Sequence, residues 1–417
     1  MNNTLEAIAP YASKRISQMA RADKEFVSLS IGEPWFGPVP VAADILSSLS
    51  ASEIHSISSL LSRYGNGRGG DRLREVVATK YRKQFGVAID PDKNVIITHG
   101  GSQAFLLSLL VATEEGDEVV VPDPTYMLYA STCVLLGRIP VRPPKSEIDG
   151  FVLSPAALKK AISGRTRLVV LNSPENPTGV VYSKAELKEL YEICVEAGVV
   201  LLQDEVYDSF VFEGEHWSCT AFDQSLCSTI QLNSMSKRYG LPGLRIGWLI
   251  ADERTISGAA KALEYIALSV SGPSHYLAEK ILSDPKVDKW IDQTREQVRA
   301  RRDMLRSAFC SLGFKFPPRC GCGGFFLFPN VTAVAGKLGD RQSVALGDFF
   351  ADWIARTAKI AVVPGSIYGS QGRDHIRLVT TVGVDELQLA IDRFRTALGG
   401  VSAHGQDTSV ERIRTSG

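Results

Sequence analysis

The chain has 417 residues, and its 46 Lys and Arg balance 46 Asp and Glu, so the formal net charge at pH 7 is zero. This balance argues against nucleic acid or a membrane surface as a partner, because both favour an excess of basic residues. Hydrophobic residues make up 44% of the chain, which is enough for the buried cores of a globular protein with two or three folded units.

The sequence also predicts a compartment. Its longest apolar runs, such as 104–112, are too short to span a bilayer. The first ten residues lack the basic start and apolar block of a secretory signal. The seven cysteines are an odd number spread over a long chain, which favours a reducing environment over a disulfide framework. We therefore expect a cytoplasmic protein without a membrane partner.

The first 45 residues are predicted to form an N-terminal arm and part of a smaller domain. They contain a helical pattern, then the β-branched run Val27–Ile31, then the turn-rich segment Gly32–Pro40. Such a short run needs partner strands from elsewhere in the chain.

From about Pro91 to Ile250, short β-branched runs alternate with amphipathic segments. The runs are Val95–Thr98, Glu118–Val121, Leu168–Leu171, Val199–Leu202, Thr229–Leu232 and Gly247–Ile250. The helical patterns between them include Gln103–Thr113, Pro155–Ala161 and Lys184–Glu196. This alternation predicts a mostly parallel sheet with helices on both faces. We assign residues 46–285 to this large α/β domain.

Beyond residue 285 the pattern changes to that of a smaller α+β domain, predicted over 286–398. A long, charge-rich helical pattern covers Lys286–Leu312, and the last helical pattern covers Asp385–Leu398. Between them lie the short strand-like runs Phe325–Pro329, Ala361–Val363 and His375–Val379. Residues 399–417 are mostly polar or small without a period, which predicts a disordered tail.

Polar motifs follow several of the predicted strands. Asp204 stands at the carboxyl end of a buried strand, where open α/β sheets bind ligands. The turn Asn172–Gly179 ends another strand and offers Asn176. Lys237 follows a third strand among hydroxyls and glycines, with Arg245 eight residues later. Each motif alone is weak evidence for a site.

A helix start completes this set. Thr98–Ala104 passes from a strand into a helix through glycines, which leaves backbone N–H groups available to an anion. These four segments, in this order, resemble the fold-type I pyridoxal 5'-phosphate (PLP) enzymes, and specifically the class I/II aminotransferase family. The resemblance runs from about Ser28 to Leu398. It implies that residues 46–285 form a PLP-binding domain.

The resemblance also implies roles for three catalytic residues. Lys237 matches the lysine that forms the internal aldimine with PLP and later serves as general base. Asp204 matches the carboxylate that pairs with the pyridinium nitrogen. Tyr207 matches a hydrogen-bond donor to the phenolic oxygen of the ring, together with Asn176.

Further cofactor contacts follow from the same resemblance. Tyr126 takes the place of the aromatic residue that stacks on the ring. Tyr64 matches a tyrosine that reaches the phosphate of the neighbouring subunit, which implies a homodimer with shared active sites. The remaining phosphate ligands are expected to be Gly101, Ser102, Gln103, Ser234, Ser236 and Arg245.

Substrate contacts are implied at both ends of the chain. Arg377 matches the arginine that binds the α-carboxylate, with Asn176 beside it, and Gly32 lies over the same group. Trp35 stands where many relatives have an aspartate, which puts an aromatic side chain near the entrance. No second arginine commits the pocket to dicarboxylates.

The function implied is transfer of an amino group between an α-amino acid and a 2-oxo acid. Elimination, replacement or cyclisation on the same scaffold are alternatives, since Ser236–Gly243 also resembles the aminocyclopropane-carboxylate synthase branch. A non-catalytic ligand-binding regulator is a further alternative. Such regulators carry an additional N-terminal DNA-binding domain, and only about forty residues precede the cofactor domain here.

Other motifs carry no assigned function. Gly65–Gly70 has the spacing of a dinucleotide-binding loop but does not follow a strand. Cys320 and Cys322 lack a second Cys/His pair, so no metal site is predicted. Glu33, Glu175 and Glu205 are expected to be solvated or locally bonded, with the alternative that Glu175 faces the site because it lies in the turn that carries Asn176.

Overall fold

The computed structural model describes residues 5–6, 23–34, 36–338 and 345–411, with side chains described up to residue 399. A seven-stranded sheet lies at its centre, in the order β2-β8-β7-β6-β5-β3-β4. Its strands are β2 (Val95–Thr98), β3 (Glu118–Val120), β4 (Ile139–Val141), β5 (Thr166–Asn172), β6 (Val200–Asp204), β7 (Thr229–Ser234) and β8 (Gly247–Ile250).

The pairing confirms the mostly parallel α/β sheet. Strands β4, β3, β5, β6 and β7 are mutually parallel, and β8 runs antiparallel to both β7 and β2. The register places Asn172 opposite Asp204 at the ends of β5 and β6. The last residues of β2, β3, β5, β6 and β7 therefore meet at one edge of the sheet.

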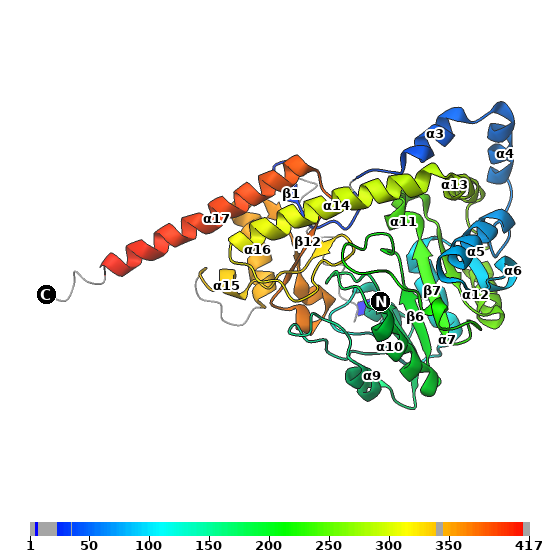
Figure 1. Ribbon diagram of the computed structural model, residues 1–417, viewed down its shortest axis with the longest axis horizontal. Coiled ribbons are helices and arrows are strands. Elements are labelled where there is room, and N and C mark those ends of the chain that lie inside the picture. Colours follow the sequence, from blue (N-terminus) through cyan, green and yellow to red (C-terminus); the bar gives the residue numbers. More distant parts are fainter. Residues whose placement is uncertain (1–4, 7–22, 35, 339–344, 412–417) are drawn as a thin grey trace.

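The two faces of the sheet belong to different cores. Along β5, Val169 and Leu171 pack into the core that also contains the smaller sheet, whereas Leu168 and Val170 pack into the other. This alternation follows from the period of two in a strand. On the first face lies α10 (Lys184–Glu196), and on the second lies α7 (Gly100–Ala112), with α12 (Glu253–Ala267) packed against it (Figure 1).

Local signals explain where the helices begin. Ser183 and Glu186 form a capping box at the start of α10, and Ser154 caps α9 (Pro155–Ala161), which has proline in its first turn. The remaining helices of the large unit are α3 (Pro40–Ser48), α4 (Ala51–Leu61), α5 (Asp71–Phe85), α6 (Pro91–Asn94), α8 (Leu128–Leu135), α11 (Met235–Arg238) and α13 (Gly272–Ser283), with 3₁₀ turns at Cys219–Ala221 and Pro242–Leu244.

A smaller α+β unit is built from both ends of the chain. β1 (Val27–Ser28) pairs in parallel with β10 (Ile360–Ala361), which joins the N-terminal segment to the C-terminal one. β11, β12 and β9 form a second small sheet. The limits placed at residues 45, 285 and 398 stay predictions. The other elements are β9 (Phe326–Leu327), β11 (Val363–Pro364), β12 (Ile376–Val379), α14 (Lys286–Ser311), α15 (Thr332–Ala335), α16 (Leu346–Ala358), α17 (Val384–Glu411) and 3₁₀ turns at Gly365–Tyr368 and Ser370–Gly372.

The last helix differs from the sequence-based expectation. We expected a tail without regular structure from residue 399, but α17 continues to Glu411 and projects from the body beside α14 (Figure 1). A helix that has already formed gains one hydrogen bond for each added residue and needs no new nucleation step. Residues with weak helix propensity after residue 398 therefore continue the helix that the packed part of α17 has started. Residues 412–417 lie outside the described part of the chain.

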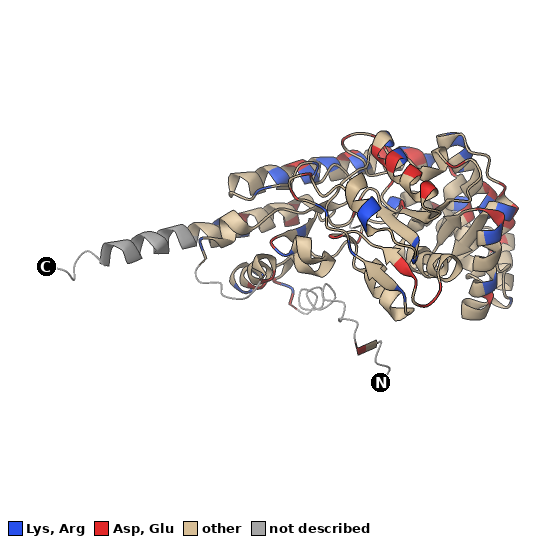
Figure 2. Ribbon diagram, turned by 90° about the horizontal axis from the view of Figure 1, so that it is seen from below, with Lys and Arg blue, Asp and Glu red and all other residues tan. Residues whose placement is uncertain are grey.

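Charged residues of both signs are interspersed over the helices, as Figure 2 shows. This distribution agrees with the zero net charge of the whole chain. Within the described residues, no helix combines the length and the apolar character that crossing a membrane requires.

Candidate active site

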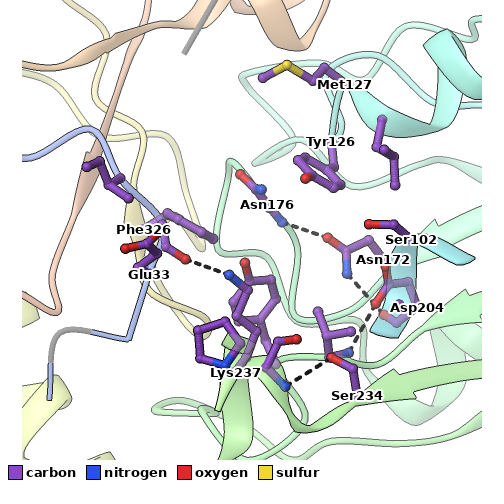
Figure 3. Close-up of a pocket in the computed structure, with 18 of the residues that line it drawn as sticks. Glu33, Ser102, Tyr126, Met127, Asn172, Asn176, Asp204, Ser234, Lys237 and Phe326 are labelled. Atoms are coloured by element: carbon purple, nitrogen blue, oxygen red, sulfur yellow. Dashed lines mark hydrogen bonds between the residues drawn. The ribbon is translucent and has the colours of Figure 1, made fainter. Parts of the chain in front are cut away.

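A cavity of about 520 Å³ opens at the carboxyl edge of the large sheet. Three parts of the chain surround it: this edge, the N-terminal segment with Glu33, and the smaller unit with Phe326 (Figure 3). Most of the predicted site residues line it, namely Gly32, Gly101, Ser102, Tyr126, Asn176, Asp204, Tyr207, Ser234, Ser236, Lys237, Arg245 and Arg377. The topology thus brings together residues from across the sequence.

Three predicted site residues are not among those lining residues. The Gln103 side chain turns back to the start of its own helix, where Oε1 accepts a hydrogen bond from the His99 backbone (2.8 Å). Tyr64 is 80% exposed on the surface. Trp35 lies outside the described residues. Their roles stay predictions.

Lys237 reaches the cavity from the short helix α11, which follows β7 directly. The Ser234 hydroxyl caps this helix by accepting a hydrogen bond from the Ser236 backbone. The Lys237 Nζ donates to the carbonyl oxygen of Gly32 (2.6 Å). Burial lowers the pKa of Lys237 to about 8, and the nearby charge of Arg377 acts in the same direction. A substantial fraction of this amine is therefore neutral near physiological pH.

Asp204 is a buried carboxylate at the end of β6. Its oxygens accept hydrogen bonds from the Tyr129 hydroxyl (2.6 Å) and the Val206 backbone (3.1 Å). Burial raises the pKa of Asp204 to about 6, while these two bonds and the charge of Lys237 act in the opposite direction. The carboxylate is therefore mostly ionised at pH 7.

An asparagine pair links the turn after β5 to the floor of the cavity (Figure 3). The Asn176 backbone donates to Asn172 Oδ1 (2.8 Å), and Asn172 Nδ2 donates to the backbone oxygen of Asp204 (3.0 Å). This leaves the Asn176 side chain directed towards the small unit, where its Oδ1 accepts a hydrogen bond from Arg377 Nη1 (3.1 Å).

Arg377 is a buried cation on β12. Its Nη2 donates to the Ser30 carbonyl (2.5 Å), and its Cζ lies 4.6 Å from the centre of the Phe326 ring. The Arg377 Nε is buried and has no hydrogen-bond partner among the described residues. Because Arg377 lines the cavity as a cation, its guanidinium is able to bind an anionic ligand there.

A second group of side chains and backbone N–H groups that could bind an anion lies at the start of α7. Gly100 has φ +75°, a conformation that favours glycine, and a Cβ there would come within 2.6 Å of Arg245 Nη2, so this guanidinium would have to shift. The same Nη2 donates to the His99 carbonyl (3.2 Å). Helix N–H groups, a guanidinium and the Ser102 hydroxyl thus converge, as binding of a phosphate requires.

Sequence reasoning missed several residues of this cavity. Tyr129 supports Asp204, and its only signal was its position three residues after Tyr126 at a helix start. The apolar residues Ile31, Met127, Leu128 and Phe326 also line the cavity. In the sequence, such residues cannot be distinguished from ordinary core positions.

Of the two expectations for Glu175 and Glu205, the structure shows bonded rather than solvated carboxylates, because both residues are buried and accept hydrogen bonds. The Tyr81 hydroxyl donates to Glu205 (2.6 Å), and His216 Nε2 lies 3.8 Å from its other oxygen. Burial raises the pKa of Glu205 to about 8 and lowers the pKa of His216 to about 4. Glu175 pairs with Lys145. The tertiary fold places both carboxylates in apolar surroundings, and this is why they are buried instead of solvated.

All seven cysteines are free thiols. Burial raises the pKa of Cys320 to about 12 and that of Cys322 to about 11, so neither is a thiolate near neutral pH. Among the residues that the structure describes, no group of three or more His, Cys, Asp or Glu side chains is arranged to hold a metal ion.

Comparison with known proteins gives concordant matches over nearly the whole chain. Residues 24–394 match the family model described as aminotransferase class I and II. The chain is 30% identical to an aspartate aminotransferase of Pyrococcus abyssi and 29% identical to aromatic-amino-acid aminotransferase 2 of Thermococcus litoralis, in both cases over 95% of this chain and 98% of the other. It superposes on the aspartate aminotransferase of Thermus thermophilus solved with maleate with a TM-score of 0.84, at 26% identity, over 95% of this chain and 99% of that one.

Proposed function

This chain belongs to the class I and II aminotransferases, and from that premise we propose which of its residues carry the reaction and which substrates it takes. It is a PLP-dependent aminotransferase, which moves an amino group between an amino acid and a 2-oxo acid. The names of its relatives give no support to elimination, cyclisation or a regulatory role.

The residues around the cavity fit PLP. One observation carries this assignment: the Lys237 amine and the Asp204 carboxylate line the same cavity, with the pKa of the amine lowered to about 8. When bound, PLP supplies an electron sink for the negative charge that develops at the substrate Cα. Asp204, kept ionised by Tyr129, would hold the proton of the ring nitrogen.

The other lining residues would anchor the cofactor. Arg245 and the start of α7 would bind its phosphate, together with Gly101, Ser102, Ser234 and Ser236. Tyr126 would stack on the ring. The Asn176 amide nitrogen and the Tyr207 hydroxyl would donate to the phenolic oxygen, since Asn176 Oδ1 already accepts from Arg377.

Lys237 and Arg377 would divide the work on the substrate. Arg377 would bind the α-carboxylate through its guanidinium, whose Nε is a buried donor, and would hold the Cα–H bond towards Lys237. The neutral Nζ of Lys237 would then take the Cα proton and return it to the cofactor carbon. Because the pKa of Lys237 is lowered to about 8, this exchange needs no strong external base.

We further propose that the preferred substrates have apolar or aromatic side chains. Three cations line the cavity, namely Lys237, Arg245 and Arg377, and each already has a role in the reaction. No further Lys or Arg of this chain lines it among the described residues, so one chain alone leaves none for a second carboxylate. Instead, the Glu33 carboxylate lines it and would repel one, while Ile31, Met127, Leu128 and Phe326 offer apolar surface.

Steady-state kinetics test both parts of this proposal. The PLP-loaded protein would be mixed with phenylalanine, leucine or aspartate and an acceptor 2-oxo acid, and formation of the new 2-oxo acid would be measured. We expect kcat/KM to be at least tenfold higher for phenylalanine or leucine than for aspartate. A higher kcat/KM for aspartate would contradict the substrate class, and ammonia release without a new amino acid would contradict transamination.

We also propose a homodimer in which Tyr64 contacts the phosphate bound by the partner. Tyr64 lies beside the end of α12, since the Gly65 backbone donates to Ser269 (3.0 Å). Exposed apolar side chains gather on these segments, including Leu61, Tyr64, Tyr265, Ile266 and Leu268. Sedimentation equilibrium should give twice the chain mass, and Tyr64→Phe should weaken PLP retention severalfold. A monomer that retains full activity would contradict the proposal.

A cytoplasmic location completes the proposal. Its support is that all seven cysteines are free thiols in the structure, which suits a reducing compartment. Thiol titration of protein freshly prepared from fractionated cells would test it, because disulfides or recovery outside the cytoplasmic fraction would contradict this location.

A further inference from the structure

A buried ion pair lies next to the active site without lining the cavity. The Lys145 Nζ is 2.5 Å and 2.6 Å from the two carboxylate oxygens of Glu175. The side chains are 0% and 3% exposed. Neither residue is among those that line the cavity, and Nζ of this lysine donates to both oxygens of the carboxylate. The pair therefore has a role other than contact with ligands.

Glu175 connects two segments that do line the cavity. Its Oε2 accepts a hydrogen bond from the Thr178 hydroxyl (2.6 Å), which closes the turn that carries Asn176. Burial raises the pKa of Glu175, and a hydrogen bond from the Thr125 side chain acts against this rise. Thr125 directly precedes Tyr126. One carboxylate thus links the turn after β5 to the loop after β3.

The turn after β5 also contacts Arg377, the residue proposed to bind the substrate carboxylate. Asn176 follows Glu175 in the chain, and its Oδ1 accepts a hydrogen bond from Arg377 Nη1 (3.1 Å). On the other side, the Arg377 guanidinium lies 5.4 Å from the ring of Tyr368, whose carbonyl accepts from the Thr125 backbone (3.1 Å). Two of the contacts that orient Arg377 therefore come from residues linked to Glu175.

A gain in folding stability is a weak explanation for the presence of such a buried ion pair. Removing two charges from water costs several kcal/mol, and an apolar pair of similar volume is often equally stable. Orientation is a stronger reason, because a carboxylate with three partners has a fixed position that an apolar side chain lacks. The location of the pair beside Asn176 agrees with this second reason.

We propose that Glu175, held by Lys145, is a positioning residue for the substrate carboxylate. It fixes the turn Asn172–Gly179 so that Asn176 keeps Arg377 in place for binding. Because Glu175 touches no reacting atom, it acts on substrate affinity and leaves the chemical step unchanged. This inference rests on the proposed role of Arg377 in substrate binding.

The test compares the wild type with Glu175→Gln and with the double variant Lys145→Met/Glu175→Gln, all loaded with PLP. For each protein, KM and kcat are measured with the best amino acid. The Kd of the corresponding carboxylate without the amino group is also measured, which for phenylalanine is 3-phenylpropionate. We expect KM and Kd to rise about tenfold in both variants, with kcat changed less than threefold and PLP content unchanged. The double variant should recover melting temperature without recovering Kd.

Glu118→Gln is the matched control. Glu118 is a buried carboxylate that accepts from Ser163 (2.5 Å) and Arg165 (2.6 Å), but it lies at the start of β3, on the opposite edge of the sheet. This variant should lose thermal stability and keep KM and Kd within twofold of the wild type. If the Glu175 variants behave like this control, the pair is only structural and the inference is wrong.

Thr178→Val is a milder variant in case the charge-removing ones do not fold. It removes one hydrogen bond to Glu175 and should raise Kd for the carboxylate about threefold, whereas an unchanged Kd would overturn the inference. Failure of the proposed function is distinguishable, because it would show as a wild type without transamination. The ratio of Kd values between wild type and variants does not depend on turnover.

Discussion

The hydroxyl of Tyr129 allows a direct test of how the Asp204 carboxylate is kept ionised. Tyr129 is buried, and its hydroxyl donates to Asp204 Oδ2 over 2.6 Å. Tyr129→Phe removes this donor and leaves the ring in place. Because the bond stabilises the ionised carboxylate, its loss should raise the pKa of Asp204 above its present value of about 6.

The size of the effect follows from the kind of bond. A hydrogen bond to a charged group contributes about 1.5–3 kcal/mol, and one pKa unit corresponds to about 1.4 kcal/mol. The pKa of Asp204 should therefore rise by about one to two units in the variant. At pH 7 the ionised fraction would fall from about nine-tenths to between about a half and a tenth.

The assay is the Kd of PLP for protein freed of cofactor, measured by fluorescence between pH 6 and 9. At pH 7 the Kd of Tyr129→Phe should exceed that of the wild type about two- to tenfold, and the ratio should approach one by pH 9, where both carboxylates are ionised. Tyr182→Phe is the control, since the Tyr182 hydroxyl is buried but accepts from the Leu153 backbone away from the cavity. A ratio for Tyr129→Phe that does not change with pH would show that the Tyr129 hydroxyl does not control the ionisation of Asp204.

Two further predictions concern the anion site and stability. Gly100→Ala forces an alanine into φ +75° and places its Cβ 2.6 Å from Arg245 Nη2. Urea denaturation should therefore show a free energy of unfolding lower by about 1–3 kcal/mol, and the variant should retain PLP less tightly. Unchanged PLP retention would contradict the proposed anion site. Burial raises the pKa of Glu205 from 4.5 to about 8, so its contribution to stability is complete below pH 4.5 and is lost as pH rises towards 8. Between pH 7 and 8 His216 is neutral in the folded state and mostly neutral in the unfolded state, so its own contribution is small. The wild type should therefore lose stability with rising pH, by at most about 1.4 kcal/mol per unit, and Glu205→Gln should lose less. Equal slopes would contradict a protonated Glu205.

The regular elements with strong local signals could be predicted from the sequence. β2 and β8 have the limits expected from their β-branched runs, and α9 and α10 have those of the predicted amphipathic segments. The order of the strands could not be predicted, because it depends on which crossovers the chain takes. The extent of α17 was also missed, since helix propagation is not encoded in residues 399–411 themselves.

The candidate site likewise contains some residues that the sequence indicates and others that only the structure reveals. Lys237, Asp204 and Asn176 lie in motifs of contiguous residues, and the fold brings them to one cavity. The residues that support them lie far away in the sequence: Tyr129 is 75 positions from Asp204, and Lys145 is 30 positions from Glu175. Such contacts arise from tertiary packing and have no local pattern that a single sequence displays.

Everything proposed about the reaction depends on Lys237 being the residue that holds the cofactor. Reduction of the PLP-loaded protein with borohydride, followed by digestion and mass spectrometry, tests it most directly. We predict that the pyridoxyl label lies on Lys237 alone and that Lys237→Ala carries none. Label on another lysine, such as Lys145, or a label retained by the variant would contradict the account.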